Sequence, residues 1–577
     1  MRRNRLYKIK ELFCFLMMSG LTVCCVNEKE HDGPIDENVS APYISLNFVM
    51  PAGSAVRGNP TGGEYGDGQE NGQDYENEIT SAVAFLYQGD NGVNSGGSTM
   101  ILATVGFNDV GVVGSGSGGT DRVYATEPRQ VELDNGMYYV LIVANPGADW
   151  WSGRTLTLND VRNHIQTKAW DNSGTDYSNF LMTSSTDAVL ILNSNTEKEP
   201  ATTDVFVERM AARLDYKALN YYECSDADFG GATVELTGAA VVNNLTAGSY
   251  LMKRVAVTVG EAPVYLGDEK LENGLPVNYV IDPWTAAKTA ANNSFTVGGV
   301  SGLPASALFG TWLPGGSEDP NWWAAYVQPG VSVSDGSEEW QRIGYTLENT
   351  TDAAEAGNRY STEIVFKATF HPKGVANYAD GETFFAIGSR IFSSMEDMMV
   401  YMYGIDFSFF DQRIEASASW TDIKTFAGQL LDNDPSGYKD FLLKQDETQH
   451  LESIKDNLKW KSYMLDHCGY SSEKRGGIYR VSLDQNGIVT RIALNPYNVR
   501  TYEDATCYYT WRVRHGNDNN DDKKGIMEYA VVRNNIYKLN VTSIYSLGDE
   551  VPGEDNNIIL DVYVNDWLLL DPETLPI

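Results

Sequence analysis

Residues Tyr43–Met50 read YISLNFVM. Large apolar side chains occupy every second position in it. Side chains two residues apart share one face of an extended strand, so the pattern predicts a β-strand with one apolar face. The residues on that face are Ile44, Leu46, Phe48 and Met50.

The strand is followed by a loose segment, Pro51–Gly58, and then by residues 58–77, which are rich in Gly, Asn, Asp and Glu. A trypsin-like protease could cut such a segment after Arg57, leaving Gly58 as the new N-terminus. Removing a built-in strand would leave an open apolar groove. The alternative is that residues 43–57 form the first strand and turn of a static domain.

The start of the chain has the pattern of an export signal. Several basic residues precede the apolar run Leu12–Met18, which is too short to span a bilayer. The run leads to Cys24 in a segment that resembles the lipobox of bacterial lipoproteins, with Cys25 as the alternative acylated residue and an ordinary signal peptide as the alternative reading. We expect a lipoprotein signal at 1–25 and a propeptide at 26–57 that contains an acidic tether and the first strand.

The composition and the net charge of the chain limit the kinds of protein that it can be. The chain has 577 residues, of which 42% are hydrophobic, and a formal net charge of −35. That charge disfavours nucleic acid and anionic membrane surfaces as partners, because both are negative. No stretch after the signal is long and apolar enough to predict a membrane helix.

Short strands punctuated by turns predict an all-β sandwich fold from Ile79 onward. Residues 91–119 are expected to form a surface hairpin, Leu158–Lys168 a helix, and Val205–Tyr216 a single strand. Helical spacing predicts a helical insertion at about 394–466. The expected domains are an N-terminal β-sandwich at 58–203 and a C-terminal β-sandwich at 204–557.

The C-terminal segment, 558–577, is apolar to its end, although chain ends are usually polar and frayed. It therefore needs a docking site, which the groove of a neighbouring molecule would provide by strand addition. The residues predicted to fill that groove are Leu560, Val562, Val564, Trp567 and Leu569.

Motifs of catalysis are absent from the sequence, so we expect no enzyme, no metal and no cofactor. Cys224, Cys468 and Cys507 are spaced too widely for a metal site and are expected to be buried small side chains. The pairs Trp150-Trp151 and Trp322-Trp323 could stack on sugars, but packing is the favoured interpretation.

Five segments of the chain carry a resemblance to a known family. They are Ser45–Arg57, Val207–Arg213, Tyr345–Thr350, Tyr508–Trp511 and, most specifically, Val531–Val541. These segments resemble the fimbrillins of Bacteroidales, and within them the shaft subunit of the minor, Mfa-type fimbria. The resemblance implies two tandem transthyretin-like β-sandwich domains, a lipidated outer-membrane precursor, and cleavage after Arg57 by an arginine-specific protease. It also implies a cell-surface polymer of this chain with other fimbrial subunits, built by donor-strand exchange and supporting adhesion to a host protein or glycan and biofilm formation.

Three alternatives stay open from the sequence. A tip or accessory subunit needs only to accept a strand, whereas the apolar C-terminal segment favours a shaft position. An anchor subunit would keep its lipid and escape cleavage. A glycan-binding surface lipoprotein would use the exposed tryptophan pairs.

Overall fold

The computed structural model describes residues 41–49, 69–401 and 479–568, with internal gaps. The chain divides into two units at Ser40, and the second unit, 41–577, contains every described element. The gaps are 90–94, 116–121, 174–175, 260–263, 266–269, 273–274, 290–294, 298–299, 304–306, 311–330, 335–338, 353–359, 395–396, 399–400, 484–488, 494–498, 517–523, 551 and 553–557.

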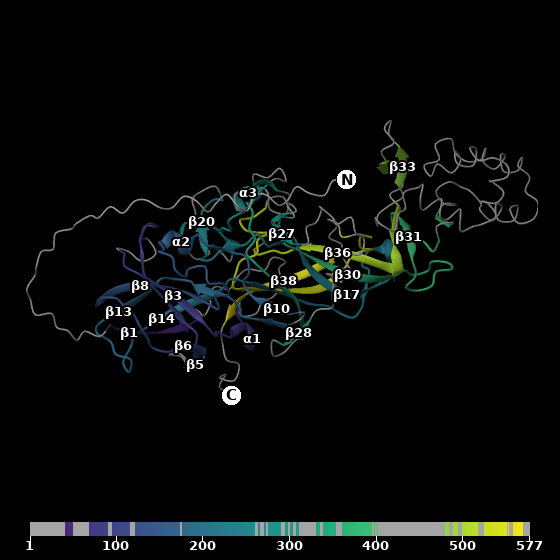
Figure 1. Ribbon diagram of the computed structural model, residues 1–577. Coiled ribbons are helices and arrows are strands. Elements are labelled where there is room, and N and C mark those ends of the chain that lie inside the picture. The colour runs from purple at the N-terminus through teal and green to yellow at the C-terminus, as the bar shows by residue number, and fades with distance from the viewer. Residues whose placement is uncertain are drawn as a thin grey trace, which may run out of the picture. The chain divides into compact units, whose positions relative to one another are not determined.

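A ten-stranded sheet forms the N-terminal half, in the order β4-β3-β8-β12-β14-β1-β6-β5, with β13 pairing β8 and β7 pairing β1. Several of these strands are labelled in the purple and blue part of Figure 1. Their bounds are β1 Tyr43–Val49, β3 Ala82–Tyr87, β4 Ile101–Phe107, β5 Val110–Ser115, β6 Arg122–Thr126, β7 Arg129–Gln130, β8 Gly136–Ala144, β12 Met182–Ser184, β13 Ala188–Leu192 and β14 Ala201–Arg209.

Both faces of this sheet carry apolar clusters, which explains why β3 is apolar throughout instead of alternating. Ala84 and Leu86 pack into the cluster that also holds the side chains of β1. Val83 and Phe85 pack on the opposite side, against residues such as Leu156.

A short helix, α2 (Leu158–Arg162), covers part of that second face. Thr157 caps its N-terminus by accepting a hydrogen bond from the backbone N–H of Asp160. The helix predicted to reach Lys168 ends at Arg162 instead, because the chain then enters β9 (Ile165–Gln166), which pairs with β19 (Ser249–Tyr250).

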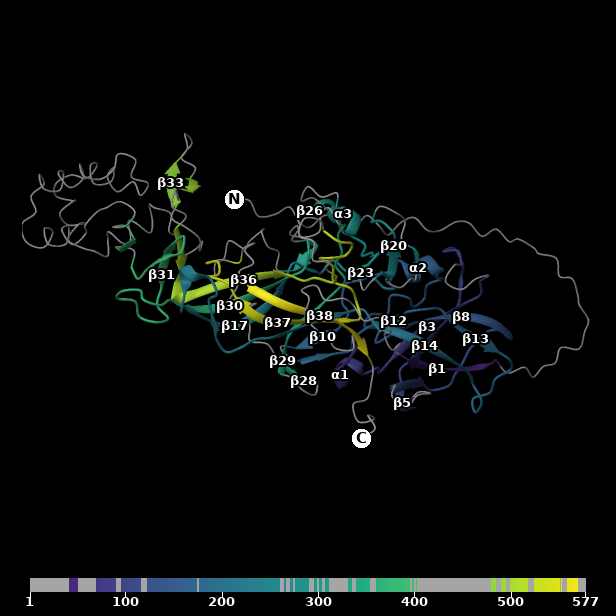
Figure 2. The ribbon, with the colours of Figure 1, turned by 180° about the vertical axis from the view of Figure 1, so that it is seen from behind.

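Two sheets form the C-terminal half, and Figure 2 shows β38 beside β37. The six-stranded sheet runs β2-β38-β37-β15-β29-β28, and the four-stranded sheet runs β16-β17-β30-β36. Both contribute to one apolar cluster, so they enclose a common core. Their bounds are β2 Gln69–Asn71, β15 Ala212–Lys217, β16 Tyr222–Glu223, β17 Thr233–Val242, β28 Val331–Ser334, β29 Glu339–Thr346, β30 Glu363–His371, β36 Thr506–Arg512, β37 Asn535–Ile544 and β38 Ile558–Leu568.

Small two- and three-stranded sheets and short helices account for the other described elements. They are α1 Asp74–Asn77, β10 Asp171–Ser173, β11 Asp176–Ser178, η2 Ala227–Phe229, β18 Asn244–Leu245, β20 Arg254–Ala256, β21 Val264–Tyr265, β22 Leu271–Glu272, β23 Leu275–Pro276, β24 Tyr279–Val280, α3 Thr285–Thr289, β25 Phe295–Val297, β26 Val300–Leu303, β27 Phe309–Gly310, β31 Phe384–Ile387, β32 Arg390–Phe392, β33 Tyr479–Leu483, β34 Val489–Ala493, β35 Val499–Tyr502 and η4 Glu503–Ala505.

The predicted strand Val205–Tyr216 is wrong, because the chain changes sheets at Met210-Ala211. β14 ends at Arg209 in the N-terminal sheet, and β15 begins at Ala212 in the C-terminal one. The side chains of Met210 and Ala211 are both buried, in two different apolar clusters. The predicted domain boundary at Asp204 thus falls inside β14.

The predicted hairpin at 91–119 is also wrong. β4 pairs with β3, whereas β5 pairs with β6, and the two strands lie at opposite ends of the sheet order. Residues 108 and 109 alone separate β4 from β5, so the two ends of this strand order lie close together, and the chain passes from one to the other without forming a hairpin. Exposure of alternate residues in β4 hid this role, since a sheet edge and a solvated hairpin look alike in sequence.

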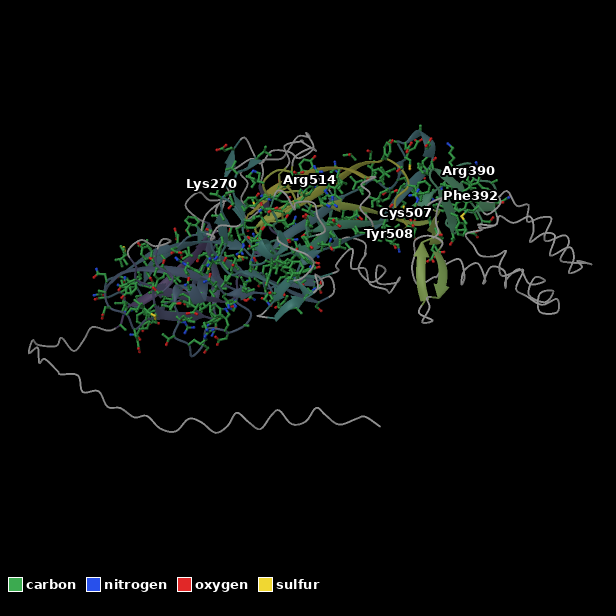
Figure 3. All side chains as sticks on the ribbon, turned by 90° about the horizontal axis from the view of Figure 1, so that it is seen from above. Lys270, Arg390, Phe392, Cys507, Tyr508 and Arg514 are labelled. Atoms are coloured by element: carbon green, nitrogen blue, oxygen red, sulfur yellow. The ribbon has the colours of Figure 1, made fainter. Side chains whose placement is uncertain are left out.

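The mostly β character predicted from the sequence is confirmed across the described residues. The predicted helical insertion at 394–466 lies almost entirely outside them. Cys224 and Cys507 are buried as expected, the latter on β36 beside Tyr508 (Figure 3), and Cys468 is not described. Within the described ranges, no helix combines the length and apolar character needed to cross a membrane.

Candidate functional site

β1, the strand that opened the sequence argument, lies in the interior of its sheet. It runs parallel to β14, with Ile44 opposite Ala201 and Val49 opposite Phe206. Its other edge pairs antiparallel with β6 and β7, where Phe48 lies opposite Tyr124. Removing β1 would therefore leave a slot with unpaired backbone groups on both sides, which is costly unless another strand fills it.

The apolar face of β1 is completely buried. Ile44, Leu46 and Phe48 are each 0% exposed and pack among residues such as Val205 and Val140. Burying a side chain of this size contributes about 1.5–3 kcal/mol, so the three together contribute about 5–9 kcal/mol gross. The slot under β1 thus has a large apolar requirement that any replacement strand must meet.

Few polar contacts fix the opposite face of β1. The Ser45 hydroxyl donates to the carbonyl oxygen of Thr126 at 2.7 Å, and the Leu46 N–H donates to the Thr126 hydroxyl at 3.0 Å. The Asn47 amide donates to Asp204 at 2.8 Å in an exposed position. Backbone pairing and the apolar face therefore supply most of what holds the strand.

A second feature is an arm, residues 69–79, that follows the predicted cut. It contains β2 and α1, and its Glu76 side chain is fully buried. Glu76 accepts from Arg213 Nη1 at 3.0 Å, while its own carbonyl oxygen accepts from Arg209 Nε at 3.0 Å. Since Arg209 ends β14 and Arg213 belongs to β15, the arm is tied to both halves at the point where the chain changes sheets.

Arg213 is the centre of that buried network. Burial lowers its pKa, but the carboxylates of Asp215, Glu76 and Glu70 outweigh burial and hold the pKa well above its ordinary value. The guanidinium donates to Asp215 through Nη2 at 2.7 Å and through Nε at 3.0 Å. Arg213 is therefore a buried cation whose charge is compensated by three acids.

The C-terminal strand β38 is seated in its own domain. It pairs antiparallel with β37 over most of its length and parallel with β2 at its end. Leu560, Val562 and Val564 are 1%, 0% and 7% exposed, and they pack into the core shared by the two C-terminal sheets. Three of the five predicted donor residues thus already have a partner surface within the chain.

Of the remaining predicted site residues, one is described and the others are not. Trp567 lies opposite Glu70 in the β2–β38 ladder. The others lie outside the described residues, and their roles stay predictions: Cys24, Cys25, Met50, Arg57, Gly58 and Leu569.

The tryptophan pair at 150–151 packs as the favoured interpretation expected. Trp150 stacks on His164, with ring centroids 4.0 Å apart, and on Phe85 at 5.7 Å, while Trp151 meets Phe85 edge-on. Both indoles pack against the apolar cluster on the second face of the N-terminal sheet, which contains Val83 and Phe85. The pair Trp322-Trp323 lies outside the described residues.

The buried arginines were not predicted from the sequence, although two of the segments that carry the family resemblance contain them. Arg209 and Arg213 lie in the first of these segments. Arg533, in the second, binds Glu348 through Nε at 2.7 Å and Nη2 at 2.6 Å, with both side chains 0% exposed. The sequence feature that could have indicated these buried arginines is an arginine within an otherwise apolar stretch.

Within the described part of the chain, no group of three or more His, Cys, Asp or Glu side chains is arranged to hold a metal ion. The geometry defines instead a β-sheet protein in which one apolar strand, β1, lies between β14 on one side and β6 and β7 on the other, while a second apolar strand, β38, lies in another sheet.

Residues 500–571 match the family described as "Major fimbrial subunit protein type IV, Fimbrillin, C-terminal". The family matched by this C-terminal region is the one that the sequence resembles, which confirms the resemblance. Among curated proteins, no relative matches.

Two solved structures are similar to the chain at low identity. The tip fimbrial protein Mfa3 from Porphyromonas gingivalis has 10% identity and a TM-score of 0.31, with 91% of this chain and 100% of that chain covered. A fimbrillin, FimA, from the same organism has 12% identity and a TM-score of 0.30, with 92% and 100% covered.

Proposed function

We propose that this protein is a shaft subunit of a surface fimbrium, exported as a lipoprotein precursor and polymerised by donor-strand exchange after cleavage at Arg57. The single observation that carries the proposal is the position of β1, an interior strand with a buried apolar face that directly precedes the predicted cleavage segment. Its partners would be further copies of itself, other fimbrial subunits and an arginine-specific protease.

In the precursor, β1 fills its slot within the same chain and blocks assembly. Cutting after Arg57 turns an intramolecular strand into a bound peptide that can dissociate. A free peptide loses the advantage of covalent connection, so a strand from a neighbour can compete for the slot. The precursor is thereby kept inert during export.

The donor strand must be shorter than the whole segment 558–577. If β38 left its sheet, Leu560, Val562 and Val564 would leave their own core, and the exchange would open one groove for each one it filled. Residues 569–577 lie outside the described part of the chain, and a donor made of them would leave Leu560, Val562 and Val564 in their own core. We therefore propose that β38, including Trp567, anchors the donor and that the donor itself is the segment 569–577.

An Arg57→Ala precursor is expected to accumulate with its N-terminal segment intact and to form no filaments, because β1 stays covalently connected to the slot it fills. N-terminal sequencing and electron microscopy would check this. Wild-type protein, treated in parallel, should start at Gly58. Filaments from uncut Arg57→Ala protein would contradict the proposed maturation, and an acylated N-terminus in wild-type filaments would indicate an anchor subunit.

Deleting residues 569–577 is expected to abolish laddering on gels while leaving the thermal unfolding of the cleaved monomer unchanged within about 2 °C. The deletion removes the proposed donor but keeps β38 and its core residues in place. As a control, the truncated protein should still accept a synthetic donor peptide of the deleted sequence. Unimpaired polymerisation of the truncated protein would exclude this donor and favour either a different one or a strand-accepting tip position.

A further inference from the structure

The arm and the C-terminal strand meet in a three-residue ladder. Gln69, Glu70 and Asn71 pair in parallel with Asp566, Trp567 and Leu568. β2 lies at the edge of the six-stranded sheet, so within the described part of the chain this ladder is its backbone pairing to the sheet. Three residues are too few for a stable strand by themselves, and side-chain contacts must supply the rest.

Glu70 supplies those contacts. Its carboxylate, 10% exposed, forms ion pairs with Arg213 of β15 and with Lys538 of β37, the latter at 2.8 Å. It also accepts from the Asn565 amide of β38 at 3.4 Å. One carboxylate thus contacts three strands of the sheet and compensates two buried cations, which makes its removal costly.

The ladder joins the segment that follows the predicted cleavage site to the segment that precedes the proposed donor. Glu70 is on the mature side of the predicted cut, so β2 is retained after cleavage. Its partners on β38, from Asp566 to Leu568, are the last described residues before the proposed donor segment. We propose that Glu70 is a positioning residue that clasps the root of the C-terminal tail to the edge of the sheet and so fixes where the donor leaves the subunit.

This inference rests on the proposed function and adds a residue to it. A fixed root restricts the conformations of the tail before insertion, so less entropy is lost when the tail is ordered in a neighbour's slot. Without the clasp, the end of β38 would fray, because a terminal strand held on one edge opens locally at low cost.

The test uses cleaved full-length protein with Glu70→Gln, and Glu78→Gln as the matched control, since Glu78 lies on the same arm but is exposed. Backbone amides of Asp566–Leu568 are expected to exchange hydrogen about tenfold faster in Glu70→Gln and at the wild-type rate in Glu78→Gln. Polymerisation of Glu70→Gln is expected to slow by a similar factor. Asn565→Ala should shift exchange in the same direction.

A rescue separates positioning from general damage. Gln69→Cys and Asp566→Cys, introduced together and oxidised to a disulfide, should restore the polymerisation rate of Glu70→Gln, and reduction should remove the rescue. Unchanged exchange at 566–568 in Glu70→Gln would overturn the clasp, as would slow polymerisation that the disulfide fails to restore. If wild-type protein forms no filaments, the proposed function fails, while the exchange measurement on the monomer still tests the clasp.

Discussion

Arg213→Ala is expected to lower the free energy of unfolding by about 3–5 kcal/mol, which is a large fraction of the stability of a typical domain. The substitution leaves Glu76 and Asp215 buried without their cation, both at 0% exposure. Water cannot solvate these carboxylates without opening the point at which the chain changes sheets. Urea unfolding monitored by tryptophan fluorescence and circular dichroism would measure the loss.

Two further variants test whether the loss of unfolding free energy comes from uncompensated charge or from lost packing. Arg154→Ala removes an exposed arginine and is expected to change stability by less than about 0.5 kcal/mol. A triple variant, Arg213→Met with Glu76→Gln and Asp215→Asn, removes the uncompensated charges and is expected to recover most of the stability. If the triple variant is no more stable than Arg213→Ala, then lost packing rather than orphaned charge explains the effect.

The sequence could predict the strands but not their partners. An alternating apolar face is a local property, and it located β1 and β38 well. Pairing is not local. Glu70 and Asn565, which are 495 positions apart, come into contact only because β2 reaches the edge of the C-terminal sheet. No pattern within either segment records that contact.

The change of sheet at Met210-Ala211 escaped the sequence argument for a related reason. Apolar alternation continues through these residues, so a period-two reading sees one strand. What divides the strand is the backbone hydrogen bonding. The Asn534 N–H donates to the carbonyl oxygen of Ala211 at 2.9 Å, and the side chain of Asn534 accepts from the Arg209 N–H at 3.1 Å. Both contacts come from a segment more than three hundred residues away.

The buried arginines show the same limit at the level of side chains. A charged residue in a strand pattern normally indicates a solvated face. Arg209, Arg213 and Arg533 are buried instead. Carboxylates accept from Arg213 and Arg533, whereas a backbone carbonyl and the Asn77 side chain accept from Arg209. The cation was visible in the sequence, but the acids that make its burial possible could not be assigned in a chain with 78 Asp and Glu residues.

Phe48→Ala in the precursor is expected to cost about 3–5 kcal/mol of unfolding free energy, because Phe48 is 0% exposed within an interior strand. Val49→Ala is the matched control, since Val49 points to the other face and is only partly buried, so its loss should be about 1 kcal/mol or less. Denaturant unfolding of the uncut proteins would measure both values.

Cleavage gives the same substitution a second and opposite consequence. Once Arg57 is cut, β1 is held only by its contacts, and a loss of about 3–5 kcal/mol in those contacts corresponds to a release of the strand that is faster by about a hundredfold to several thousandfold. Cleaved Phe48→Ala should therefore polymerise with a much shorter lag than cleaved wild type, although the uncut protein is less stable. The mature chains are identical in sequence, so only the departing strand can explain a difference. Equal lags would mean that β1 does not leave before assembly, and the slot it fills would then be a static part of the fold.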